Sequence, residues 1–206
     1  SEAMYIPVGH RTADGQYGNL PKDKVIEALR PVVEDPSIRK IGQNLKYDYQ
    51  IFKRSGLALR GISFDTMIAA YLLNPGLRQH NLDAIAEEWL AVKATPIEDL
   101  IGTGKTQVTF DYVGIIPAAK YSAEDVILPL KLQPLLAREL SARNLTRLFD
   151  TIEIPLVPVL AEMEWSGVLI DDHLMKQLSL EYSRKLAKVT AEVHALAGEE
   201  FNLNSP

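Results

Sequence analysis

Two spacings of apolar residues alternate along the first third of the chain. Short β-rich runs are each followed by a segment whose apolar residues recur at helical spacing. Stop signals of the proline, glycine and asparagine type end the helical segments. The pattern predicts strands and helices in alternation, and hence an α/β fold, with strands at residues 3–8, 38–43 and 59–65 and helices at 21–34, 45–55 and 66–73.

After residue 75 the pattern predicts helices only. Apolar spacing indicates helices at 81–90 and 117–142, separated by a polar loop at 101–110, and we expect Pro129 and Pro134 to kink or divide the second. The composition then becomes more apolar, which places a domain boundary near residue 150. Beyond it we expect an apolar helix that ends before Gly167 and a final helix that Asp171 or Asp172 can cap.

The final helix carries an apolar stripe along one side, at intervals of three and four residues. We expect this stripe to pack against the 151–166 helix and, where it is still exposed, against another copy of the chain. The stripe comprises Leu174, Leu178, Tyr182, Leu186, Val189, Val193 and Leu196.

Composition and charge are those of an ordinary globular protein. The chain has 206 residues, of which 47% are hydrophobic and 24% charged, and its formal net charge is −5. Any contact with nucleic acid must therefore depend on a local patch or on bound metal ions. No cysteine is present, so disulfides, thiolate zinc sites and a cysteine nucleophile are excluded, and a reducing, cytoplasmic location is expected. No apolar run approaches the ~20 residues of a membrane span.

The sequence gives little support for a P-loop phosphate site or for a histidine metal site. The stretch GTGKT at 102–106 resembles the end of a phosphate-binding P-loop, but the required first glycine falls on Asp99 and no strand precedes the loop. The four histidines have no partner at helical spacing, so a histidine metal site is not expected. Only His80, beside Asn81, is kept as a candidate phosphate contact.

Asp48 is unusual because a short carboxylate is unfavourable inside a helix and its neighbours at helical spacing are apolar. Asn44 precedes it by four residues and shares its face. The same spacing recurs far along the chain, where Tyr121 and Asp125 share a helical face. Taken singly, each pair is also compatible with chance, and Asp48 with an exposed carboxylate that pairs with Lys53 or Arg54.

In their order and context the two pairs resemble motifs of the DnaQ-like 3'-5' exonuclease family. The stretches GQNLKYD, LRGISFDTM, NLDAIAEEWL, GKTQVTF and YSAEDV are similar to the proofreading domain of bacterial family A DNA polymerases. The later stretches IEIPLVPVLAEMEWSGVLID and AGEEFNLNSP resemble the entry to the polymerase thumb. The resemblance covers nearly the whole chain, and it implies an exonuclease domain at 1–150 and the start of a polymerase domain at 151–206.

The resemblance implies an RNase H-like fold with a mixed sheet and a two-metal site for Mg²⁺ or Mn²⁺. Asp125 would ligate the metal that activates the attacking water, and Asp48 would hold the second metal through water. Tyr121 would orient the water as a neutral phenol. The substrate would be the single-stranded 3' end of DNA, with contacts from Gln43, Asn44 and His80.

One part of the family pattern is missing, because no aspartate here is followed by glutamate two residues later. The family's first motif, Asp-x-Glu on the leading strand, supplies the carboxylates that complete the metal site. We therefore expect a fragment cut after that strand and inactive by itself. Two alternatives stay open: an exoribonuclease of the RNase D type, and a decayed exonuclease domain that serves as a scaffold.

Overall fold

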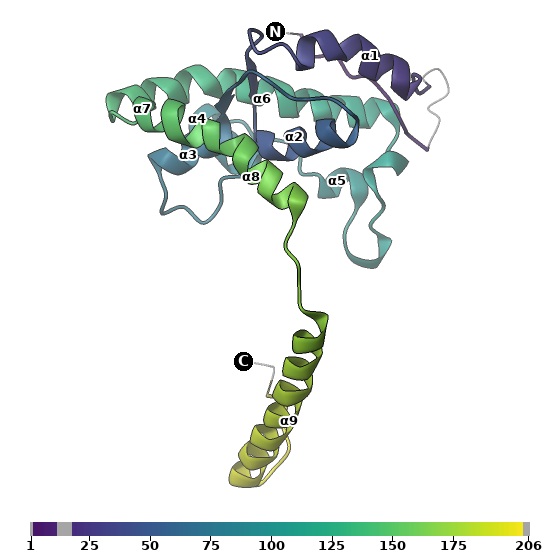
Figure 1. Ribbon diagram of the computed structural model, residues 1–206, viewed down its shortest axis with the longest axis vertical. Coiled ribbons are helices and arrows are strands. Elements are labelled where there is room, and N and C mark those ends of the chain that lie inside the picture. Colours follow the sequence, from purple (N-terminus) through teal and green to yellow (C-terminus); the bar gives the residue numbers. More distant parts are fainter. Residues whose placement is uncertain (1, 12–17, 204–206) are drawn as a thin grey trace. The chain divides into compact units, whose positions relative to one another are not determined.

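The computed structural model describes residues 2–11 and 18–203, so the ends of the chain and part of the glycine-rich segment after residue 8 lie outside it. The chain divides into two compact units, Ser1–Trp165 and Ser166–Pro206, which are described separately (Figure 1). The first unit therefore continues past residue 150 and includes most of the last apolar helix before Gly167. The assignment of exonuclease and polymerase portions to 1–150 and 151–206 stays a prediction.

The first unit is a mostly helical α/β structure with a small parallel sheet. Strand β1 (Lys40–Gly42) pairs with β2 (Ile62–Asp65), and an irregularity in register follows Lys40. The helices are α1 (Lys22–Val33), α2 (Leu45–Arg54), α3 (Thr66–Leu73), α4 (Leu82–Leu90), α5 (Glu98–Ile101), α6 (Ile115–Ala142), α7 (Thr146–Leu148) and α8 (Ile154–Ser166), with 3-10 turns at Gly104–Thr106 and Phe110–Tyr112 and a π turn at Phe149–Glu153.

The predicted strand at residues 3–8 is wrong, since no part of this segment pairs as a strand. Its backbone bonds to loops instead: the Pro7 carbonyl accepts from the Leu20 amide at 2.8 Å, and the Arg11 amide donates to the Asp111 carbonyl at 2.7 Å. Within the described residues the sheet is consequently parallel and two-stranded. The β-rich composition of residues 3–8 is not sufficient for a strand, because a strand also needs a neighbouring strand to pair with.

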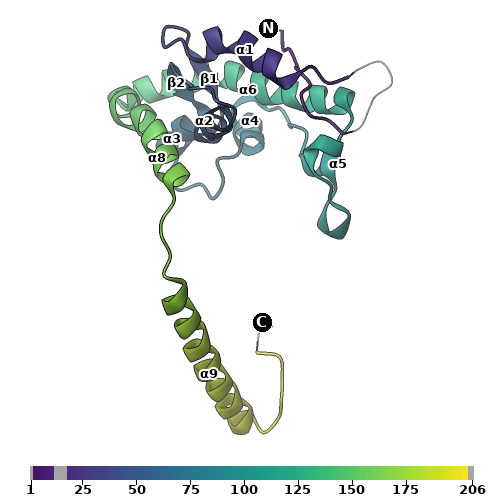
Figure 2. The same ribbon diagram turned by 45° about the vertical axis from the view of Figure 1, so that its right-hand side comes forward.

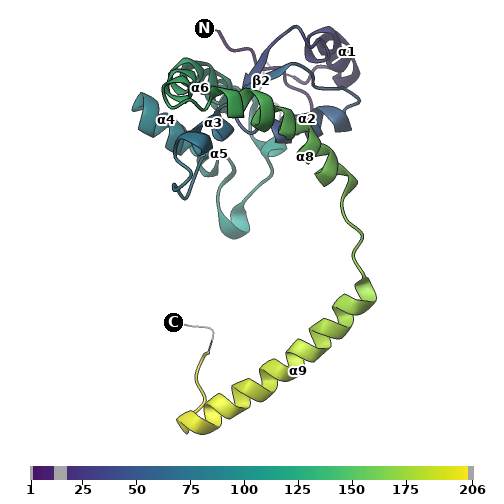
Figure 3. The same cartoon turned by 60° about the vertical axis from the view of Figure 1, so that its left-hand side comes forward.

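Helix α6 is continuous over 28 residues, so Pro129 and Pro134 do not divide it, and the alternative of a kink stays a prediction. Figure 2 and Figure 3 show it alongside the shorter helices of the unit, and it contacts α3 and α4 most extensively. One side of α6 is fully buried, with Leu128, Leu132, Leu136 and Leu140 at four-residue spacing. Burial of such a row offsets the backbone hydrogen bonds that the prolines remove.

The main core forms where α6 meets β2, α3, α4 and the π turn. Phe64 and Phe149 pack with ring centroids 4.9 Å apart, and both are almost completely buried. A smaller cluster of Val33, Leu57 and Leu59 joins α1 to the segment before β2. These clusters fix the ends of β1 and β2 next to α6, which decides where the side chains after each strand can lie.

The second unit is built on α9 (Asp172–Ala197), as predicted. Asp171 caps it by accepting a hydrogen bond from the Leu174 amide, and Gly198 ends it with φ of +79°. Most of the predicted apolar stripe is exposed, including Tyr182, Leu186 and Val189. In the part of the chain that the structure describes, no helix is long and apolar enough to cross a bilayer.

Candidate functional site

Helix α2 begins directly after β1 and carries the first predicted pair. Asn44 occupies the N-cap position with left-handed backbone angles (φ 55°, ψ 49°), a conformation that asparagine tolerates better than most residues. Its side chain makes no capping bond to the helix. Asp48 follows in the first turn, where the helix dipole favours a negative charge.

Asp65, which the sequence analysis left without a role, caps α2 from a distance. It ends β2, and its Oδ2 accepts a hydrogen bond from the Leu45 amide at 2.7 Å, while Oδ1 accepts from the Asn44 amide at 3.1 Å. Oδ1 also accepts from the Met67 and Ile68 amides, which caps α3. The sequence signal was present, since an aspartate before an apolar helical run is a typical N-cap.

One cavity of about 870 Å³ brings together four of the six predicted site residues. It lies between the end of β1, the start of α2 and the middle of α6, and Arg39 and Asn81 also line it. The predicted residues in its wall are Gln43, Asn44, Asp48 and Asp125. Asp48 is half-buried and Asp125 is exposed, so the carboxylates lie where water and a polar ligand can reach them.

Both carboxylates in this cavity hold protons more tightly than usual. Burial raises the pKa of Asp48 to about 6, and the nearby charge of Asp65 adds to this. Although Asp125 is exposed as a residue, partial burial of its carboxyl group raises its pKa to about 6, with further contributions from the charges of Asp83, Glu124 and Asp48. Clustered carboxylates have this behaviour when no cation compensates them.

Tyr121 lies one turn before Asp125 on α6 but lines a neighbouring cavity of about 500 Å³. Its ring packs near Phe110, with centroids 6.0 Å apart. Burial, followed by the charge of Asp125, raises the pKa of the Tyr121 phenol to about 12. The phenol is therefore protonated at neutral pH and can donate a hydrogen bond.

His80 lines neither of these cavities. Its ring nitrogen Nε2 donates to the Asn74 carbonyl at 3.0 Å, and its ring packs edge-on near Tyr71. Its backbone carbonyl accepts a 2.8 Å hydrogen bond from the Gln43 side chain. The contact between residues 43 and 80 links the loop before α4 to the cavity wall, but the role of His80 toward DNA stays a prediction.

The acidic surroundings of Asp125 extend beyond the predicted residues. The charges of Asp83, at the start of α4, and of Glu124 raise the pKa of Asp125. Glu124 is itself fixed, because its two carboxylate oxygens accept from the amide and the hydroxyl of Thr95 at 2.9 and 3.1 Å. Sequence reasoning missed both residues, since nothing in their spacing connects residue 83 with the middle of α6.

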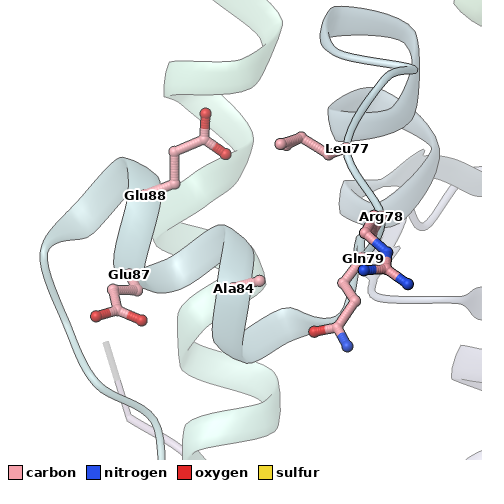
Figure 4. Close-up of a pocket in the computed structure, with 6 residues that line it drawn as sticks. All are labelled: Leu77, Arg78, Gln79, Ala84, Glu87 and Glu88. Carbon is pink, nitrogen blue, oxygen red and sulfur yellow. The ribbon is translucent and has the colours of Figure 1, made fainter. Parts of the chain in front are cut away.

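A further hollow lies between the loop after α3 and helix α4. Its lining residues are Leu77, Arg78, Gln79, Ala84, Glu87 and Glu88 (Figure 4). It contains none of the predicted site residues. Its open, mixed-charge wall contributes nothing to the carboxylate site.

The opposite side of α2 is held by α8 through charged side chains. Lys46 pairs with Glu164 and Lys53 pairs with Glu162, each at 2.5 Å, and Tyr49 donates to Glu162 at 3.0 Å. The ammonium of Lys53 also lies 4.8 Å from the ring centroid of Trp165. Helix α2 is thus fixed by Asp65 at its first turn and by α8 along its outer face.

The donor set suits a hard divalent cation only in part. Asp48 and Asp125 offer the oxygen ligands that Mg²⁺ and Mn²⁺ prefer, and they line one solvent-accessible cavity. Among the described residues, however, no three histidine, cysteine, aspartate or glutamate side chains group closely enough to hold a metal ion. A cation here would keep several water ligands, as Mg²⁺ commonly does.

Comparison with known proteins shows the family of the chain. A family model described as 3'-5' exonuclease matches residues 1–141. DNA polymerase I of Pseudomonas aeruginosa is 39% identical over 208 residues, which cover 100% of this chain and 23% of that protein. The chain spans between 21% and 23% of the length of this polymerase and of the one from Rhizobium leguminosarum.

Solved structures show the same fold. The polymerase domain of Pol1 from M. smegmatis, in complex with DNA primer-template and dNTP, is 26% identical with a TM-score of 0.67 over 92% of this chain and 29% of its own. Brucella melitensis NrnC with bound Mg²⁺ has a TM-score of 0.53 at 21% identity, over 70% of this chain and 68% of its own. The predicted RNase H-like α/β class is confirmed. The chain belongs to the 3'-5' exonuclease family, in the form found in DNA polymerase I.

Proposed function

We propose that the chain is the part of a DNA polymerase I that removes nucleotides from the 3' end of single-stranded DNA. The observation that carries the proposal is that Asp48 and Asp125, from two separate helices, line one cavity, where the charge of Asp48 helps to raise the pKa of Asp125. In this assignment residues 1–150 form the exonuclease portion and 151–206 lead into the polymerase portion. Proofreading and DNA synthesis belong to the whole protein.

Asp48 and Asp125 would hold Mg²⁺ or Mn²⁺, which in such sites activate water and stabilise the leaving oxygen of a phosphodiester. Other residues of the chain are assigned to orienting the water and binding the DNA. The Tyr121 phenol donates a hydrogen bond toward the attacking water, and Gln43 and Asn44 offer amide groups to the DNA end. His80 would contact a phosphate from the adjoining loop. NrnC, a protein with the same fold, carries bound Mg²⁺.

By itself the 206-residue chain should be catalytically silent. It contains no Asp-x-Glu sequence, and two carboxylates leave each dication mostly hydrated. A strand that carries Asp-x-Glu, added at the N-terminus, would supply further ligands to the same cavity. We call this longer protein the extended form.

The test is hydrolysis of a labelled single-stranded DNA 3' end with Mn²⁺ by the chain and by the extended form. The extended form should be active, the chain silent, and Asp125→Ala in the extended form should remove most of the activity. Asp150→Ala, which changes an exposed aspartate outside the cavity, is the matched control. Clear Asp125-dependent hydrolysis by the chain alone would contradict the proposed role of Asp-x-Glu.

The same assay separates the remaining alternatives. Preference for a ribo-oligonucleotide over a deoxy-oligonucleotide would favour an exoribonuclease. Absence of hydrolysis by the extended form on either substrate would favour a structural scaffold. A cytoplasmic location and self-association through α9 stay predictions.

A further inference from the structure

Asp65 is the most completely buried charged side chain among the described residues, with 1% of its surface exposed. It lies at the junction between β2 and α3, and it does not line the carboxylate cavity. Buried carboxylates need several hydrogen-bond donors to be tolerated. Asp65 has four, and all of them are backbone amides.

The four amides belong to the first turns of two different helices. Met67 and Ile68 donate from α3, at 2.9 and 3.3 Å, as in an ordinary N-cap. Asn44 and Leu45 donate from the start of α2, some twenty residues earlier in the chain. A single carboxylate therefore satisfies amides at two helix N-termini that would otherwise lack partners.

Helix α2 depends on this contact because it has no side-chain cap of its own. The neighbouring residue strengthens the same junction: the Thr66 hydroxyl lies 3.2 Å from the Gly42 carbonyl and 2.5 Å from Oε1 of Gln43. The left-handed turn at Asn44 is thus held from both sides by the end of β2. This turn sets the direction of the first helical turn, which carries Asp48.

We propose that Asp65 is a positioning residue for the nuclease site, acting through the Asn44 and Leu45 amides to keep Asp48 directed into the cavity that Asp125 also lines. The proposal rests on the function proposed above. Asp65 does not touch substrate or metal in this role; it holds the helix that does. Groups that orient metal ligands in this way typically change metal affinity or activity by about 10- to 100-fold when they are altered.

Asp65→Asn separates positioning from simple helix capping. An amide oxygen in the place of Oδ1 can still accept from Met67 and Ile68, and so can retain the cap of α3. The amide nitrogen would then face the Leu45 N–H, where two donors oppose each other. Asp65→Ser is a second probe, because its hydroxyl is long enough to cap α3 and too short to reach Leu45.

The first readout is amide hydrogen exchange of the chain itself. Exchange at Leu45 should accelerate by about tenfold or more in Asp65→Asn, while Met67 and Ile68 keep their protection. Val157→Ala, which removes buried atoms from α8 without touching these hydrogen bonds, is the control for general loss of stability. Equal acceleration at Leu45 and Met67, as in that control, would overturn the inference.

The second readout is the Mg²⁺ concentration that gives half-maximal hydrolysis by the extended form. It should rise by about tenfold in Asp65→Asn and in Asp65→Ser, and remain near the wild-type value in Val157→Ala. Asp125-dependent hydrolysis with an unchanged Mg²⁺ requirement in both Asp65 variants would overturn this inference alone. Hydrolysis that is absent, or independent of Asp125, in the extended wild type would overturn the proposed function and this inference together.

Discussion

Asp48 and Asp125 lie on α2 and α6, line one cavity, and are coupled, because the charge of Asp48 helps to raise the pKa of Asp125. Burial is the larger cause for both groups, and each pKa is about 6. Folding thus places two carboxylates where their negative charges are poorly stabilised. A bound dication would remove that penalty, as the proposed metal-dependent function requires.

The first prediction concerns the stability of the metal-free chain. The folded pKa of Asp48, about 6, lies above its usual value of 3.8, so the unfolded chain loses this proton first. The group therefore lowers the free energy of unfolding as the pH rises from about 4 to about 6, and the penalty persists above that range. Asp48→Asn should stabilise the chain by about 1 kcal/mol near pH 8, a figure reduced for partial exposure, and hardly at all near pH 4.

Urea unfolding in EDTA at the two pH values measures this difference. Asp150→Asn serves as the control, because that side chain is exposed and outside the cavity. A gain of the same size at both pH values would show that Asp48 destabilises the fold for some reason other than its charge.

The second prediction is that Tyr121→Phe will be milder than Asp125→Ala in the extended form. The substitution removes one hydrogen-bond donor and leaves both carboxylates in place, so kcat should fall by about tenfold. Loss of Asp125 should cost at least about 100-fold. Single-turnover hydrolysis of a single-stranded DNA 3' end compares the two. An equally deep defect in Tyr121→Phe would contradict the orienting role, particularly as its phenol lines a neighbouring cavity.

The third prediction compares two glycines with the same positive φ angle. Gly56 and Gly61 both have φ of +73°, but a Cβ at Gly61 would lie 2.5 Å from the Ile38 carbonyl oxygen, whereas a Cβ at Gly56 would meet nothing within 4 Å. Gly56→Ala should cost about 1 kcal/mol from backbone conformation alone. Gly61→Ala should cost at least about 2 kcal/mol more, because the segments before β1 and β2 must separate.

Thermal unfolding of the two variants, under identical conditions, gives the comparison. Similar losses of stability in both would mean that the close approach of residues 38 and 61 is relaxed at little cost. Gly61 lies next to the pairing of β1 with β2, so that outcome would also mean that this end of the sheet can shift at little cost.

Much of the helical structure could be predicted because its signals are local. The C-terminal end of α2 and both ends of α9 follow from residues within a turn of the helix end, namely Gly56, Asp171 and Gly198. The predictions fail where contacts with residues distant in the sequence determine the local structure. Residues 3–8 have strand composition but pair with no strand among the residues that the structure describes. The prolines of α6 are tolerated because the helix buries a row of leucines.

The candidate site also combines features that depend on local sequence with features that depend on distant contacts. Equal spacing placed Asn44 with Asp48 and Tyr121 with Asp125, but spacing cannot show that α2 and α6 meet at one cavity. The resemblance to a known family supplied that link. Asp65 was missed for the opposite reason: its local role as the cap of α3 was readable, whereas its bonds to α2 depend on the parallel pairing of β1 with β2.

The last prediction concerns α9, whose apolar stripe is largely exposed, with 69% of Leu186 and 53% of Val189 accessible. An apolar face of this length is costly in water, so it should pack against the 151–166 helix and, where it is still exposed, against a second copy of the chain. Leu186→Gln should shift the apparent mass measured by light scattering toward the monomer at high protein concentration. Lys176→Gln, an exposed change on the same helix, should leave the mass unchanged. A strict monomer at every concentration, with α9 fully helical by circular dichroism and its stripe accessible to solvent, would contradict both forms of packing.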